Sequence, residues 1–83
     1  MDTVEDVIKA AISNVLGIPA SEIPESESLR VLGADEIDVE EIAMILEDSY
    51  DALLDLAFDW CTPSSTVESI AAEIKERAEH GYQ

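Results

Sequence analysis

Apolar residues recur at spacings of three and four along most of this chain, which is the period of an amphipathic helix. The first such segment covers residues 4–16, where Asp2 or Thr3 can cap the start and Gly17 can end the helix. No segment alternates apolar and polar residues as a strand does. The 83 residues form a single domain, 1–83, whose hydrophobic content of 47% is ordinary for a packed core. The sequence therefore predicts an all-α fold, a small bundle of three main helices plus one short helix.

Two further main helices follow from the same periodicity. The second begins near Asp35, whose carboxylate can cap it, and runs to about Tyr50. The last begins with Ser65, which forms a capping-box pattern with Glu68. Between them, residues 52–60 are apolar apart from two aspartates and predict the short helix.

A long loop separates the first two main helices. Residues 18–33 contain Pro19 and Pro24 and no helical pattern. Loops of this length are uncommon in a compact domain unless their own apolar residues pack into the core. We therefore expect this loop to be held by Ile23, Leu29 and Leu32.

The second helix has an unusual outward face. A core stripe forms on one side, comprising Val39, Ile42, Ala43, Leu46 and Tyr50, while Ile37 and Met44 point away from it. From Asp35 to Asp51 the chain has eight carboxylates and no base. This pattern predicts a small apolar spot in a negative field. Isolated surface apolar residues are also common, so a simple solvated face is the alternative.

The charge balance limits the classes of partner. Twenty acidic residues against four basic ones give a formal net charge of -16, which repels a phosphate backbone and attracts a cationic protein surface. Nucleic acid is therefore not an expected partner. The first residues lack the basic and apolar regions of a signal peptide, and no apolar run is long enough to span a membrane. We expect a monomeric, cytoplasmic protein without a membrane partner.

A search for catalytic and metal-binding residues is largely negative. The one histidine, His80, lies three residues from the end of the chain. Asp35, Asp38 and Glu41 lack the spacing of a calcium loop. The aspartates at 51, 55 and 59 are better explained as the solvent-facing side of an amphipathic helix than as a cation site. Cys61 has no basic neighbour that would favour its thiolate form. The sequence predicts neither an enzyme nor a specific metal site.

A resemblance emerges at the start of the second helix. Residues 32–38 read Leu-Gly-Ala-Asp-Glu-Ile-Asp, and residues 39–47 continue as an acidic amphipathic helix ending in Leu-Glu. This resembles the acyl carrier protein family, which reads leucine, glycine, alanine, aspartate, serine, leucine, aspartate before a similar helix. The order and lengths of the segments resemble the family over nearly the whole chain. The resemblance implies the fold of an acyl carrier protein.

The resemblance also implies a lost attachment point. In the family, the serine at the position of Glu36 carries 4′-phosphopantetheine, and a carboxylate cannot form that phosphodiester. We therefore expect no cofactor on Glu36. The surrounding residues match the acidic and apolar surface that family members present to basic partner enzymes, which gives a predicted partner-binding set of Asp35, Ile37, Asp38, Glu40, Glu41, Met44, Glu47 and Asp48.

These observations favour an acyl carrier protein-like, non-enzymatic domain that docks on basic protein surfaces, such as an acyl-transfer or synthase enzyme, without a phosphopantetheine arm. One alternative is a genuine acyl carrier protein of fatty acid or polyketide synthesis seen as a serine-to-glutamate variant, since a carboxylate at the start of a helix imitates a phosphodiester charge. Modification at Ser26, Ser28 or Ser49 is a further possibility. An acidic mimic of nucleic acid is supported by charge alone. Residues 52–61 are more apolar than in the family, so the resemblance does not establish whether the protein has an acyl-chain pocket.

Overall fold

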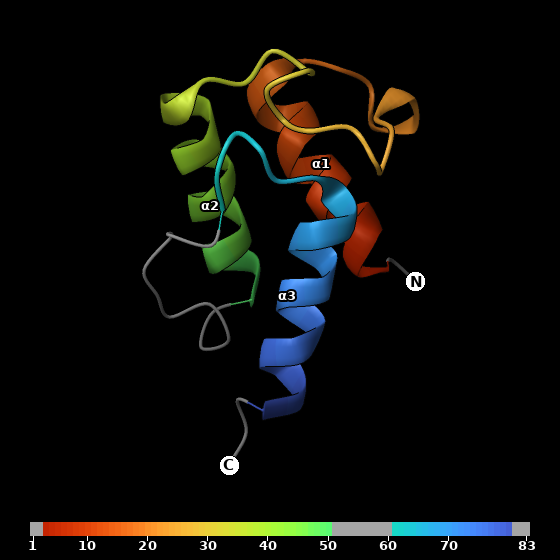
Figure 1. Ribbon diagram of the computed structural model, residues 1–83, viewed down its shortest axis with the longest axis vertical. Helices are drawn as coiled ribbons and strands as arrows, with labels where there is room; N and C mark the ends of the chain where they lie inside the picture. Colours follow the sequence, from red (N-terminus) through yellow and green to blue (C-terminus); the bar gives the residue numbers. More distant parts are fainter. Residues whose placement is uncertain (1–2, 51–60, 81–83) are drawn as a thin grey trace.

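The computed structural model describes residues 3–50 and 61–80, the last two without their side chains, and their regular elements are all helical. In chain order these are α1, Val4–Leu16, a short 3-10 helix, η1, at Ala20–Glu22, α2, Glu36–Tyr50, and α3, Val67–His80. Helix α1 packs against both α2 and α3 (Figure 1). The predicted all-α bundle with a long first loop is confirmed. The predicted short helix at 52–60 lies outside the described residues.

Helix α1 has the ends that its sequence predicts. The Thr3 hydroxyl accepts a hydrogen bond from the Asp6 amide, and the Asp6 carboxylate accepts one from the Thr3 amide, which completes a capping box. Gly17 ends the helix with φ 76°, a left-handed conformation that glycine adopts at little cost. Between these ends, Ile8, Ala11 and Ile12 face the core.

Helix α3 begins one residue later than the sequence predicts. Its cap is Thr66, whose hydroxyl accepts from the Ser69 amide at 3.0 Å while the Ser69 hydroxyl accepts from the Thr66 amide at 2.9 Å. The Ser65 hydroxyl instead accepts from the Thr62 amide at 3.0 Å. The predicted capping box of Ser65 with Glu68 was therefore wrong, because Ser65 closes the turn that precedes the helix.

The loop between α1 and α2 is fixed at several points. Ile23 and Leu29 are buried and Leu32 packs against the core, as predicted. The Leu29 amide donates to the Ser65 carbonyl at 2.9 Å, and the Arg30 amide donates to the Pro63 carbonyl at 2.8 Å. We call these two hydrogen bonds the loop clasp. They join the residues before α2 to the turn before α3, beside an isolated antiparallel bridge between Ser28 and Thr66.

The core draws on all three main helices. Its largest fully buried side chains are Ile8, Ile12, Leu29, Ile42, Leu46, Ile70, Ile74 and Val67. Truncating one such side chain to alanine in a close-packed core costs about 2–5 kcal/mol. The predicted core positions of α2 are confirmed at Val39, Ile42, Ala43 and Leu46, with Tyr50 packed at the edge.

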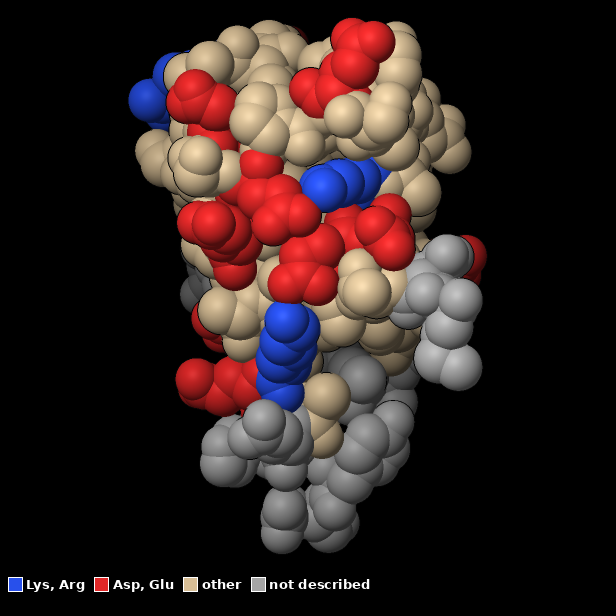
Figure 2. Space-filling view, turned by 90° about the vertical axis from the view of Figure 1, so that its right-hand side faces the viewer, with Lys and Arg blue, Asp and Glu red and all other residues tan. Residues whose placement is uncertain are grey.

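Ion pairs in the described part of the chain lie away from α2. Lys9 pairs with Glu25 at 2.7 Å, Lys75 with Glu5 at 2.9 Å and Arg77 with Glu73 at 3.2 Å. Figure 2 shows the face that lies on the right of Figure 1, where acidic side chains crowd around a few cationic ones. The acidity therefore extends well beyond α2. Within residues 3–50 and 61–80, no helix has the length and apolar character needed to cross a bilayer.

Candidate functional site: an acidic helix and its groove

The site begins where the loop enters α2. Gly33 has φ 99°, and the chain then extends through Ala34, which is buried. Asp35 caps the helix, since its Oδ1 accepts from the Asp38 amide at 2.9 Å. The Asp38 Oδ2 accepts in turn from the Asp35 amide at 3.2 Å. The predicted cap at Asp35 is confirmed, and both aspartates of the predicted partner-binding set take part in it.

Glu36 is the first residue of α2 and its side chain is exposed. Within the described residues its carboxylate makes neither a hydrogen bond nor an ion pair. The helix dipole favours a negative charge at this position. Glu36 is thus displayed at the helix start by a rigid cap, with its carboxylate available to a ligand.

The outward face of α2 carries the apolar spot that the sequence predicts. Ile37 is 68% exposed and Met44 is 59% exposed. Around them lie the exposed carboxylates of Glu40, Glu41 and Asp48 and the partly buried Glu47. No ion pair among residues 3–50 and 61–80 neutralises any of these four. The predicted partner-binding residues therefore come together along α2, and their binding role remains a prediction.

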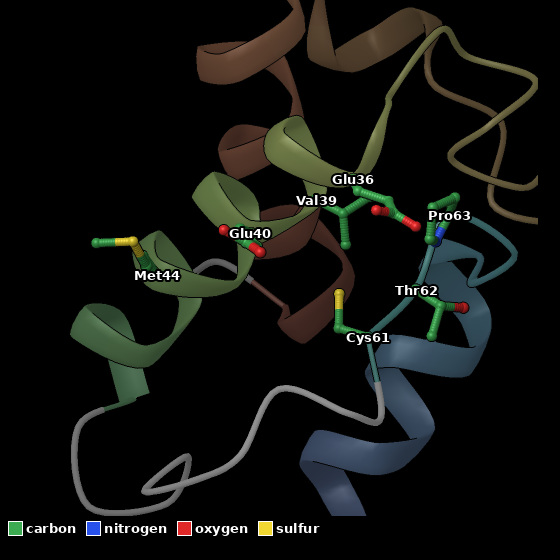
Figure 3. A pocket seen from close by; sticks show the side chains of 7 residues that line it. All are labelled: Glu36, Val39, Glu40, Met44, Cys61, Thr62 and Pro63. Carbon is green, nitrogen blue, oxygen red and sulfur yellow. The ribbon is translucent and has the colours of Figure 1, made fainter.

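A groove of about 330 Å³ lies between α2 and the segment that leads to α3 (Figure 3). Its α2 wall is formed by Glu36, Val39, Glu40 and Met44, and its other wall by Cys61, Thr62 and Pro63. In Figure 3 the Glu36 carboxylate is directed toward Pro63, and Met44 points away from the other wall. Sequence reasoning missed Thr62 and Pro63, since no pattern in the chain indicates that they face α2.

Cys61 lies in the wall of this groove. Only 6% of it is exposed, and burial raises the pKa of its thiol to about 11. A thiol that stays protonated at neutral pH is a poor nucleophile. The described residues contain no group of three or more His, Cys, Asp and Glu side chains suited to a metal ion.

Met44 stands between this groove and a second hollow. The second hollow, also about 330 Å³, lies where α1 meets α2 and is lined by Asn14, Val15, Glu41, Met44 and Ile45. Each hollow carries at least one α2 carboxylate beside Met44. Met44 therefore forms a ridge between the two hollows.

Comparison with known protein families identifies the class. The family model described as the phosphopantetheine attachment site matches residues 6–74, from the first turn of α1 into α3. The match covers most of the chain, so the protein belongs to this family of carrier domains. The resemblance to acyl carrier proteins is confirmed at this level, and carrier domains of this kind are typically non-catalytic. No solved structure matches the chain.

Proposed function

We propose that this protein is an acyl carrier protein-like domain without a phosphopantetheine arm, which acts by docking α2 on a basic surface of a partner protein. The single observation that carries the proposal is the combination of Glu36 and the α2 face. Glu36 occupies the first, exposed position of α2, and the face beside it offers apolar side chains among unpaired carboxylates. The position that would display a reactive hydroxyl displays a carboxylate instead.

The chemistry of the arm does not fit Glu36. Attachment needs an alcohol oxygen to form a phosphodiester, whereas a carboxylate would form a labile mixed anhydride. The hydroxyl of Ser28 accepts from the Val31 amide at 3.3 Å, and that of Ser49 donates to the Ile45 carbonyl at 2.9 Å. Neither serine lies at the start of α2. These observations support a domain that works without the group.

Docking on a cationic partner is supported by charge and shape together. The formal net charge is -16, and the α2 carboxylates outside the cap make no ion pair within the described chain. Long-range attraction would speed and orient the encounter with lysines or arginines. Ile37 and Met44 would supply the apolar contact that persists after docking. Such a domain would regulate, scaffold or stabilise a partner such as an acyl-transfer or synthase enzyme.

The test is a mass measurement. The purified protein is incubated with coenzyme A and a broad-specificity phosphopantetheinyl transferase, beside an acyl carrier protein known to be modified. We expect the mass of this protein to stay unchanged while the control gains one arm. A gain of one arm by the unaltered protein would overturn the arm-less function.

A further inference from the structure

The groove beside Glu36 is lined by both carboxylates and apolar side chains. Glu36 and Glu40 lie on its α2 wall four residues apart, a spacing that brings their Cβ atoms to within about 5–6 Å. Val39, Met44 and Pro63 provide apolar surface next to them. A ligand that fills this groove must therefore offer positive charge and apolar surface at once.

We propose that the groove binds an arginine side chain of the protein partner. The proposal rests on the proposed function and deepens it, since it makes Glu36 a direct anchor for the partner at the place where the family carries its arm. The aliphatic part of the arginine would lie on Val39 and Pro63, and the guanidinium would meet the carboxylates of Glu36 and Glu40. Long cationic side chains bury their stems on apolar surface in this way.

Arginine fits this groove better than lysine. A guanidinium is planar and has several N–H donors in a fixed fork, so it can bridge two carboxylates on neighbouring helix turns. It is also more weakly hydrated than an ammonium group, so less hydration is lost when it enters a partly enclosed groove. Lysine offers a compact, strongly hydrated point charge that suits one carboxylate at a time.

Cys61 gives an independent indication of a ligand. Its side chain is more than nine-tenths buried, and Figure 3 shows its sulfur pointing from the far wall toward α2. The thiol makes no hydrogen bond to any residue in the described part of the chain. A guanidinium N–H can donate to sulfur, which is a weak acceptor. Within residues 3–50 and 61–80, the groove thus contains an unpartnered polar atom as well as two unpaired carboxylates.

The experiment uses short capped peptides as probes. The ¹⁵N-labelled full chain is titrated with acetyl-Gly-Arg-Gly-amide and, at equal ionic strength, with the lysine and citrulline counterparts, while amide chemical shifts are recorded. Citrulline has nearly the shape of arginine without its charge. We expect saturable shifts at residues 36–40 and 61–62 with arginine, weaker shifts with lysine and none with citrulline. Weak binding is expected, with a dissociation constant on the order of millimolar or higher, because partly exposed ion pairs contribute little to affinity.

Variants that each remove one carboxylate charge test where the arginine binds. Glu36→Gln and Glu40→Gln should each weaken arginine binding about threefold, the scale of a partly exposed ion pair. Glu76→Gln is the matched control, because it removes the same charge from an exposed residue of α3 that lines neither the groove nor the α2 face. Equal loss from all three variants, equal binding of the three peptides, or shifts confined to α2 without residues 61–62 would overturn the groove proposal. Failure of the proposed function is detected separately by the mass measurement, which involves no arginine ligand.

Discussion

Asp35 and Asp38 cap each other at the start of α2, each carboxylate accepting a hydrogen bond from the other residue's amide, at 2.9 and 3.2 Å. This reciprocal pair fixes the direction in which the helix leaves the loop. It therefore sets where the next side chain, Glu36, is displayed. The geometry of the proposed docking surface therefore depends on this cap.

The cap gives the first prediction. Asp35→Ala should lower the free energy of unfolding by about 1 kcal/mol, within a range of about 0.5–2, because the first amides of α2 lose their acceptor. Chemical denaturation followed by circular dichroism measures the change. Asp35→Asn is the control and should lose much less, since asparagine is also a good N-cap. Equal stability of the alanine and asparagine variants would show that the cap contributes little.

A second prediction concerns the attachment chemistry. Glu36→Ser should fold normally, because this side chain is exposed and makes no hydrogen bond within the described residues. It should also gain one arm when incubated with coenzyme A and the transferase, as intact mass would show. Glu40→Ser places the hydroxyl one turn further along α2 and should stay unmodified. A folded Glu36→Ser protein that is never modified would mean that the surface around this position has diverged from the carriers.

The third prediction separates charge from apolar contact in docking. With a partner captured from the source cell, Glu41→Lys and Asp48→Lys should slow association and flatten its salt dependence. Met44→Ala should mainly hasten dissociation, with a loss of about 1 kcal/mol or more if Met44 is a hot spot. Surface plasmon resonance at several salt concentrations distinguishes the two effects.

Matched changes elsewhere serve as controls for docking. Val31 is as exposed as Ile37 but lies in the loop before α2, so Val31→Ala should leave dissociation unchanged. Glu76 is exposed on α3, and Glu76→Lys makes the same charge reversal away from α2. If a captured partner binds the α2 variants as tightly as the original protein, the α2 face is a solvated surface.

A fourth prediction follows from the burial of Cys61. With a pKa of about 11, its thiol should react with iodoacetamide about a hundredfold more slowly at pH 8 than the same thiol in urea, because the thiolate is the reacting form. Folding favours the neutral thiol, so this contribution to stability is complete below the unfolded pKa and is lost as pH rises through about 11. Equal rates in the folded and unfolded protein would show that the thiol is accessible and its pKa ordinary.

The fifth prediction concerns self-repulsion. Twenty acidic residues face four basic ones, so added salt should raise the melting temperature, and magnesium chloride should act at lower concentration than sodium chloride. A gain of about 1 kcal/mol corresponds to roughly 4–8 °C in a domain of this size. Differential scanning calorimetry gives the midpoint. An unchanged or falling midpoint in both salts would show that the charges are better compensated than their number suggests.

Local signals determined how much of the fold could be predicted. The cap of α1, predicted at Asp2 or Thr3 and found at Thr3, the stop at Gly17 and the core stripe of α2 each depend on residues close in sequence. The orientation of Ile37 and Met44 followed from the same helical period. These features need no knowledge of tertiary contacts, because backbone geometry and neighbouring side chains decide them.

Long-range contacts determined the rest. The sequence predicted Ser65 as the cap of α3, whereas in the structure Ser65 closes the preceding turn and its carbonyl accepts a hydrogen bond from the Leu29 amide of the distant loop. The groove could not be predicted for the same reason, since its second wall is formed by residues 61–63, which are distant from the start of α2 in the sequence. The assignment of Glu36 to the attachment position remains a prediction from the resemblance.

The loop clasp has a consequence for motion at the groove. The amides of Leu29 and Arg30 donate to carbonyls of the turn before α3, and one of those carbonyls belongs to Pro63, which lines the groove. These amides can exchange their hydrogen for deuterium only when the two segments part. Their protection therefore measures the free energy that holds this wall in place, independently of any fraying at the far end of α3.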